Sequence, residues 1–145
     1  MKDWTRTFSQ HLWIKPDNTG LEDAQFIQRA LQLCKGRTVL DAPCGAGRIA
    51  IHLAHAGCQV TGIDRQSSFV DRATARFQKE GVKGTFLCGD LREIDFDETF
   101  DAAFSWNGSF GYFTDAENLL VLQRYAHALR DDGCLLVDQP NRENL

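Results

Sequence analysis

The 145-residue sequence predicts an α/β fold: a doubly wound, open, mostly parallel sheet with about five strands. Three observations carry this prediction. Five short apolar runs lack strict polar alternation, which is typical of strands covered on both faces. Helical patterns separate several of these runs, and glycines follow the helical patterns. Because strands separated by full helices require right-handed parallel crossovers, the alternation favours one continuous parallel sheet.

The first elements are a helix and a strand. Apolar residues recur every three or four positions before Gly36, which predicts a lead-in helix that this glycine can close. They are Leu21, Ala24, Ile27, Leu31 and Cys34. The expected strands, beginning directly afterwards, are 38–42, 59–63, 85–88, 100–105 and 134–138.

Helical stripes follow the first, second and fourth expected strands. Their apolar positions are Ile49, Ala50, Leu53 and Ala54; Val70, Ala73 and Phe77; and Leu119, Leu122, Ala126 and Leu129. Capping-box spacing predicts helix starts at Ser68 with Asp71 and at Thr114 with Glu117. Helix ends are expected at Gly57, Gly81 and Gly133. The stretch between Cys88 and Phe100 shows no clear helical stripe.

Composition limits the partners. The net charge is −4 and the pI about 5.5, so nucleic acid and anionic membrane are unfavoured as main partners. The five cysteines form no C-x-x-C pair, which predicts neither a zinc site nor a disulfide framework and indicates buried thiols in a reducing cytoplasm. No apolar window approaches a membrane span, and the start lacks a signal-like apolar stretch.

The length favours one domain over 1–145. Residues 1–36 would form an N-terminal arm and the lead-in helix, and residues 37–139 the core.

The candidate site lies where the strands end, because open parallel sheets bind ligands at the carboxyl ends of their strands. Asp41 ends the first strand and precedes a loop with Gly45 and Gly47, whose small size lets backbone approach a ligand. Asp64 follows the second strand and Asp90 the third. We expect the three acids to share one rim.

The loop motif alone leaves two cofactors open. Gly45-x-Gly47-x-x-Ala50 also matches a dinucleotide fingerprint, and Asp64 lies at a suitable distance from it. A pyrophosphate would be repelled by Asp41. S-adenosylmethionine carries a sulfonium, an ammonium, hydroxyls and an amine but no phosphate, so a rim of carboxylates favours it.

These motifs resemble those of class I S-adenosylmethionine-dependent methyltransferases, which have a Rossmann-like core. The resemblance rests on V-L-D-A-P-C-G-A-G-R, V-T-G-I-D, C-G-D, F-D-A-A-F-S-W-N-G-S-F-G-Y-F and D-G-C-L-L-V-D, and looks closest to the small-molecule branch. It implies that Gly45 and Gly47 contact the methionine portion, Asp41 its ammonium, Asp64 the ribose, and Asp90 with Leu91 the adenine. The cofactor-binding residues expected on this basis are Asp41, Pro43, Cys44, Gly45, Ala46, Gly47, Asp64, Arg65, Gly89, Asp90, Leu91, Trp106 and Asn107.

Two departures from the family pattern stand out. Pro43 occupies a position where the family usually has glycine, and it donates no amide. Complete members usually continue into another helix and two more strands, so the chain resembles a truncated or minimal member. A strand left open at the sheet edge would favour a homo-oligomer.

The segment after the fourth strand carries the candidate chemistry. Ser105-Trp106-Asn107-Gly108 lacks the Pro-Pro-aromatic sequence of nucleic-acid amino-methyltransferases, which favours a small-molecule acceptor. Methyl transfer depends mainly on alignment. Weak candidates for a base are Tyr112, His11 and Asp115; the aromatic N-terminal residues Trp4, Phe8 and Trp13 could form a lid or an anchor. His52 and His55 lack a third ligand, so no metal is expected.

Two other functions stay open. A nicotinamide-dependent oxidoreductase would use the glycine fingerprint, with Arg65 meeting a 2′-phosphate. A truncated module that binds the donor without turnover would lack part of the acceptor pocket.

Overall fold

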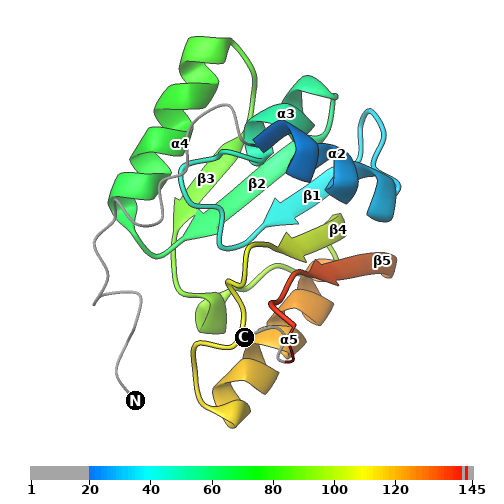
Figure 1. Ribbon diagram of the computed structural model, residues 1–145, viewed down its shortest axis with the longest axis vertical. Coiled ribbons are helices and arrows are strands. Elements are labelled where there is room, and N and C mark those ends of the chain that lie inside the picture. Colours follow the sequence, from blue (N-terminus) through cyan, green and yellow to red (C-terminus); the bar gives the residue numbers. More distant parts are fainter. Residues whose placement is uncertain (1–19, 142, 144–145) are drawn as a thin grey trace.

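A computed structural model describes residues 20–141 and 143 of the chain. Its centre is a sheet of five strands in the order β3-β2-β1-β4-β5, in which every neighbouring pair is parallel (Figure 1). The strands are β1 (Thr38–Asp41), β2 (Gln59–Asp64), β3 (Thr85–Cys88), β4 (Phe100–Ser105) and β5 (Leu129–Val137). The predicted fold class, an open parallel α/β sheet, is confirmed.

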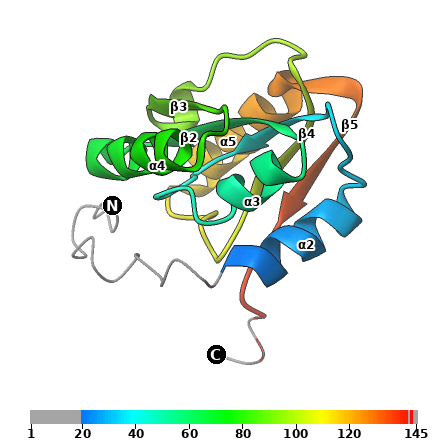
Figure 2. The same cartoon turned by 90° about the horizontal axis from the view of Figure 1, so that it is seen from above.

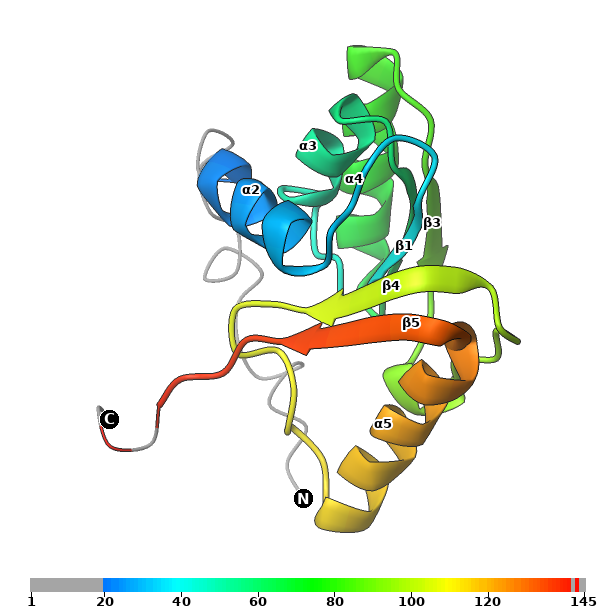
Figure 3. The same cartoon turned by 90° about the vertical axis from the view of Figure 1, so that its right-hand side faces the viewer.

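Helices cover both faces of this sheet. They are α2 (Gly20–Ala30), α3 (Ala50–His55), α4 (Ser67–Glu80) and α5 (Asp115–Ala128), together with the 3-10 helix η3 (Leu91–Glu93). Figures 2 and 3 show α2, α3 and α4 on one face, and α5 on the other. The chain proceeds from β1 outward to β3 and then returns to the other side of β1 with β4. The carboxyl ends of β1 and β4 therefore flank the switch point, where this architecture places ligands.

Two apolar cores lie against the two faces. Because successive side chains of a strand point to opposite faces, Val39 packs with α2 and α3, whereas Leu40 packs with α5. Phe77 of α4 belongs to the first core and meets Phe86 edge to face at 4.7 Å. Tyr125 of α5 fills the second core, and its hydroxyl donates a hydrogen bond to the backbone oxygen of Ala42. The strand that carries Asp41 is thus held on both faces.

The predicted buried stripe of α5 is wrong by one helical row. Leu119 is 55% exposed and Leu122 is 37% exposed, whereas the side chains that face the sheet are Val121, Tyr125 and Ala128. Both rows have helical spacing, so periodicity alone did not separate them. Burial of Tyr125 is compatible with its polar hydroxyl because the hydroxyl reaches a backbone acceptor inside the core.

The start of the last strand was also predicted wrongly. β5 begins at Leu129, directly after α5, instead of at Cys134, and Gly133 lies inside the strand instead of ending a helix. Leu129 pairs with Phe100, and the register shifts before Cys134 pairs with Ala102. The polar residues in this irregular stretch resemble a loop in sequence, because they lie on an exposed strand.

Other boundaries also divide into correct and incorrect predictions. The Thr114–Glu117 capping box forms, and Gly81 closes α4 with a left-handed conformation (φ +69°). The cap predicted at Ser68 is absent, because α4 already begins at Ser67 and its N-cap residue, Gln66, forms no side-chain cap. The lead-in helix ends at Ala30, well before Gly36.

Two predictions concern the outer strand β3 and the connection from β3 to β4. β3 is mostly exposed instead of covered on both faces, because it lies at the sheet edge. Between β3 and β4, a stretch that is fully described, the only helical element is η3, as the missing stripe predicted.

Candidate functional site

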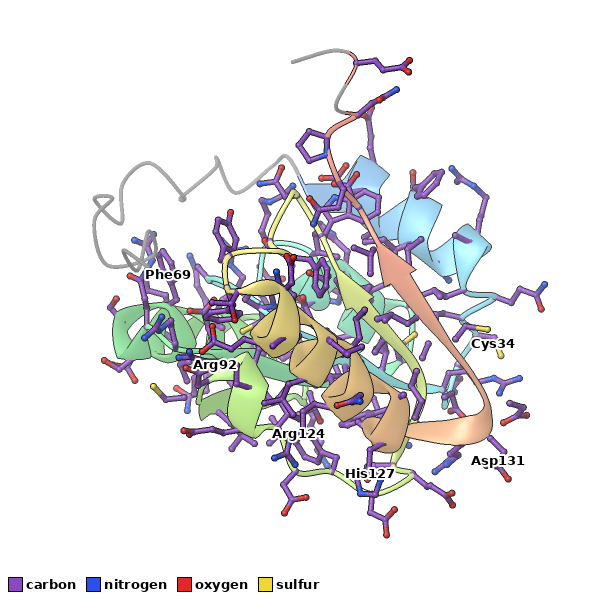
Figure 4. All side chains as sticks on the ribbon, turned by 90° about the horizontal axis from the view of Figure 1, so that it is seen from below. Cys34, Phe69, Arg92, Arg124, His127 and Asp131 are labelled. Atoms are coloured by element: carbon purple, nitrogen blue, oxygen red, sulfur yellow. The ribbon has the colours of Figure 1, made fainter. Side chains whose placement is uncertain are left out.

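A pocket opens at the carboxyl ends of β1, β2, β3 and β4. The three strand-end acids, Asp41, Asp64 and Asp90, all contribute to its lining, as expected. The β1 loop forms another part of the wall. A further part comes from the segment after β4, through Trp106, Asn107, Ser109, Tyr112 and Phe113. In Figure 4, Phe69 and Arg92 lie toward one end of the molecule and Cys34 and Asp131 toward the other.

Most of the predicted cofactor-binding residues line this one pocket. They are Asp41, Pro43, Cys44, Gly45, Ala46, Asp64, Arg65, Gly89, Asp90, Leu91, Trp106 and Asn107. Gly47 is absent from the lining and packs toward α4, where an added Cβ would lie 3.2 Å from the Cβ of Ala73. The structure therefore brings twelve of the thirteen predicted residues to one pocket, whereas Gly47 packs against α4.

The catalytic candidates are distributed differently. Tyr112 lines the pocket, whereas the exposed Asp115 begins α5 and is absent from the lining. Phe110 packs against the core beneath α5. His11 lies outside the described residues, as do the aromatic residues Trp4, Phe8 and Trp13 of the predicted arm.

The β1 loop is shaped by glycines and backbone hydrogen bonds. Gly45 has φ +54°, and its N–H donates to the Oδ2 atom of Asp64 at 2.9 Å. The N–H of Cys44 donates to the carbonyl oxygen of Ile63 at 2.8 Å, so the loop is attached to β2 at two points. A Cβ added to Gly45 would meet no atom within 4 Å. The space beside Gly45 is therefore open to a ligand.

Asp64 is held by two backbone amides. Besides Gly45, the N–H of Gln66 donates to its Oδ1 atom at 2.9 Å, and the residue is only 7% exposed. Burial raises the pKa of Asp64, and the two amide hydrogen bonds oppose this increase. A carboxylate has about four lone-pair sites, so one that accepts these two bonds can still accept hydroxyl donors.

Asp41 is the most deeply buried acid of the pocket. It is 3% exposed, and burial together with the charge of Asp64 raises its pKa well above the ordinary range. Arg48 partly opposes this effect, but its guanidinium also forms an ion pair with Asp23 at 2.9 Å. Two buried carboxylates beside one another favour a cationic ligand, because a cation would reduce their mutual repulsion.

We expect Asp41→Asn to stabilise the ligand-free protein. A raised native pKa means that the unfolded state ionises first, so Asp41 supports folding in acid and loses this contribution as the pH rises from 3.8 toward the raised value. At pH 7 the variant should gain about 0.5–2 kcal/mol in the free energy of unfolding, a gain typical of stabilising substitutions. Chemical denaturation at several pH values measures the gain, which should vanish below about pH 4.

Asp101→Asn is the matched control for that substitution. Thr38 and Arg130 lower the pKa of Asp101, so its charge contributes stability at neutral pH. The control should therefore lose stability at pH 7. A loss of stability in both variants would contradict our account of Asp41.

Asp90 differs from the other two acids because it has a strong partner. The guanidinium of Arg92 donates to its Oδ1 atom at 3.0 Å and to its Oδ2 atom at 2.7 Å, and the backbone N–H of Arg92 donates at 2.9 Å. These bonds lower the pKa of Asp90. Asp90 is therefore an oriented, ionised carboxylate. In Asp41 and Asp64, by contrast, burial disfavours the ionised form.

Several lining residues were missed by the cofactor-binding prediction. They are Arg48, Ile49, Gln66, Phe69, Arg72, Arg76, Ser109 and Phe113. Phe69, Arg72 and Arg76 recur every three or four positions, so one face of α4 reaches the pocket. That spacing was the available signal, although it also fits an ordinary solvent-facing row. The others are neighbours of the recognised motifs.

The two histidines of α3, His52 and His55, do not line the pocket. The Nε2 atom of His55 lies 3.1 Å from Oε2 of Glu80. Within residues 20–141 and 143, no group of three His, Cys, Asp or Glu side chains is arranged to hold a metal ion. Over the same residues, no helix has the length and apolar character needed to cross a bilayer.

The open parallel sheet, the glycine loop after β1 and the acids at three successive strand ends are the arrangement that the resemblance to class I methyltransferases predicts. The chain belongs to the methyltransferase domain family, whose family model matches residues 39–133. The predicted resemblance to the methyltransferases is therefore confirmed at the level of this family.

Three similar proteins illustrate the match. The cypemycin N-terminal methyltransferase of a Streptomyces species is 33% identical over 71% of this chain and 42% of its own length. The ubiquinone biosynthesis O-methyltransferase of Bradyrhizobium diazoefficiens is 31% identical over 79% of this chain and 44% of its own length. The solved structure of a TehB-like SAM-dependent methyltransferase from Corynebacterium glutamicum is 28% identical with a TM-score of 0.66, over 78% of this chain and 59% of that one. The chain thus spans less than half of these two curated relatives.

Proposed function

We propose that this chain binds S-adenosylmethionine in the strand-end pocket and transfers its methyl group to a small-molecule acceptor. The observation that carries the proposal is the convergence of Asp41, Asp64 and Asp90 beside the open space at Gly45. A ligand with cationic groups and hydroxyls, but no phosphate, suits this set of acceptors.

The residues present fit the methyl donor, and each can be given a role in holding it. The open space at Gly45 would admit the methionine portion. Asp41, whose ionised form a nearby cation would stabilise, would hold the ammonium of that portion. Asp64, fixed by its two amides, would accept the ribose hydroxyls. Leu91 would contact the adenine beside Asp90. When bound, the donor supplies an electrophilic methyl group on a sulfonium.

The protein's own contribution to transfer is alignment. Trp106, Tyr112 and Phe113 give the pocket an aromatic wall that can exclude water and face a cation. This wall is held from outside the pocket. The ring of Trp106 lies 5.7 Å from that of Phe26, and the N–H of Asn107 donates to Asp138 at 2.9 Å.

Tyr112 suits the role of a hydrogen-bond donor better than that of a base. Burial raises its pKa above the ordinary value of 10.0, so the phenol stays protonated at neutral pH. The Tyr112 hydroxyl can therefore donate a hydrogen bond to the methyl-accepting substrate but does not remove a proton from that substrate. We propose that acceptors reach the pocket already nucleophilic, or lose their proton to solvent.

Of the two alternative functions, the nicotinamide-dependent oxidoreductase is supported less well than the donor-binding module. A nicotinamide dinucleotide would bring its diphosphate beside Asp41 and Asp64. Burial already disfavours the negative charge of both side chains, and the charge of a diphosphate would add to this cost. A module that binds the donor without turnover is the second candidate, because Tyr112, the candidate base among the described pocket residues, stays protonated at neutral pH.

Transfer of a radiolabelled methyl group tests the proposal. The chain is incubated with methyl-labelled S-adenosylmethionine and a panel of small amines, phenols, carboxylic acids and thiols, with oligonucleotides as the control set. We expect label in at least one small molecule and none in the oligonucleotides. Label in oligonucleotides alone would overturn the small-molecule proposal, and donor binding without any transfer would favour the binding module.

Location and assembly are secondary proposals. All five cysteines lie among the described residues and are free thiols, which supports a cytoplasmic location. The prediction that they are buried is correct for Cys44 and Cys58 and wrong for the exposed Cys34, Cys88 and Cys134. β5 forms one edge of the described sheet, so a second copy could pair there.

A further inference from the structure

Arg92 lies just outside the pocket and contacts two of its walls. Its backbone belongs to η3, and its side chain lies beside the N-terminal end of α5 (Figure 4). It is absent from the pocket lining, whereas Asp90, Leu91 and Phe113 belong to that lining. Arg92 therefore contacts the pocket through residues that line it.

The guanidinium of Arg92 is shared among three partners. Two of its nitrogens bond the carboxylate of Asp90, and its Nη1 atom donates to Oε1 of Glu117 at 2.9 Å. Its central carbon lies 4.3 Å from the centre of the Phe113 ring, a cation–π contact. The planar fork of an arginine can make these contacts together, whereas a lysine ammonium is a single point.

Each partner belongs to a different part of the site. Asp90 follows β3 on the side proposed for the adenine, and Phe113 ends the aromatic segment that follows β4. Glu117 closes the capping box with Thr114, so it fixes the start of α5. Asn118 holds the Phe113 backbone at both its N–H and its carbonyl, at 3.2 Å and 3.1 Å. One side chain thus connects the β3 end, the aromatic wall and α5.

We propose that Arg92 is a positioning residue that fixes the β3 wall of the pocket relative to the aromatic wall, and thereby sets donor affinity. This inference rests on the proposed function, because the donor side is assigned there. It adds a role for a side chain outside the pocket. Without the fork, Asp90 loses its orienting partner and Phe113 loses the cation that covers its ring.

The test is calorimetric titration with S-adenosylhomocysteine on the wild type and three variants. Arg92→Lys keeps the charge but loses the fork, and we expect its Kd to rise roughly tenfold. Glu117→Gln keeps the capping box, since glutamine serves equally at that position, and weakens only the pair with Arg92. We expect a few-fold rise for it. The double variant should resemble Arg92→Lys, because both changes break one network.

Arg130→Ala is the matched control. It removes a guanidinium that bonds Asp101 at 2.9 Å, and neither residue lines the pocket. We expect a lower melting temperature with an unchanged Kd. This separates a positioning role from a loss of stability alone.

The outcomes distinguish the two proposals. If the wild type binds S-adenosylhomocysteine and Arg92→Lys binds it equally well, the inference is overturned and the proposed function stands. Additive effects in the double variant would likewise overturn it. If the wild type does not bind, the proposed function fails and the inference fails with it. Should Arg92→Lys not fold, an unchanged Kd in Glu117→Gln overturns the inference.

Discussion

Gly45→Val should abolish binding of S-adenosylmethionine. Gly45 has φ +54°, a conformation that costs an ordinary residue about 1–2 kcal/mol and a β-branched residue more. The open space beside Gly45 would also receive the valine side chain, so the proposed place of the methionine portion would be filled. Calorimetry with S-adenosylhomocysteine measures the loss, which we expect to exceed a hundredfold in Kd.

Gly81→Val provides the control for backbone strain. Gly81 has φ +69°, and a Cβ added there also meets nothing within 4 Å, but it closes α4 and is absent from the pocket lining. This variant should lose stability comparably and still bind the ligand as the wild type does. Normal affinity in Gly45→Val would show that the β1 loop does not contact the donor.

Asp64→Ala should weaken the donor nearly as strongly. Its carboxylate would accept two ribose hydroxyls, and hydrogen bonds to a charged group contribute about 1.5–3 kcal/mol each. The substitution also removes the acceptor of the Gly45 and Gln66 amides, so the β1 loop loses one of its attachments to β2. We expect the Kd for S-adenosylhomocysteine to rise about 100-fold or more, measured by calorimetry.

Asp64→Asn separates the charge from the shape. The amide oxygen can still accept one of these bonds, so its loss of affinity should be intermediate, about tenfold. Its stability should fall, because the amide NH2 would face one of the two backbone N–H groups, of Gly45 or Gln66, that now donate to the carboxylate. An alanine variant that binds like the wild type would remove Asp64 from the site.

The parallel α/β sheet and the location of the pocket could be predicted from the sequence for a physical reason. Strands covered on both faces, such as β1 with its buried Val39 and Leu40, must be continuously apolar, and that pattern is visible in one dimension. Parallel strands also end at one edge, so Asp41, Asp64 and Asp90 could be expected together before any coordinates.

The errors arose where the tertiary partner decides between equal local patterns. α5 carries two apolar rows; the row with Tyr125 packs in the core, where its hydroxyl reaches the backbone oxygen of Ala42, while Leu119 is exposed. The first residues of β5 are polar because they lie on an exposed, irregular edge, so composition concealed that part of the strand.

The pocket was predicted less completely than the fold. Motif spacing identified the strand ends and the β1 loop, but the α4 residues that reach the pocket carry no motif. The role proposed for Arg92 depends on a guanidinium shared among Asp90, Phe113 and Glu117. Glu117 lies 25 positions from Arg92, and no local pattern predicts that convergence.

Parallel calorimetric titrations of the wild-type chain with S-adenosylhomocysteine and with NADPH test the central claim most directly. We predict saturable heat at one site per chain with S-adenosylhomocysteine, and none with NADPH. Saturation by NADPH with no response to S-adenosylhomocysteine would contradict the claim that the acids at the strand ends select a sulfonium donor over a diphosphate.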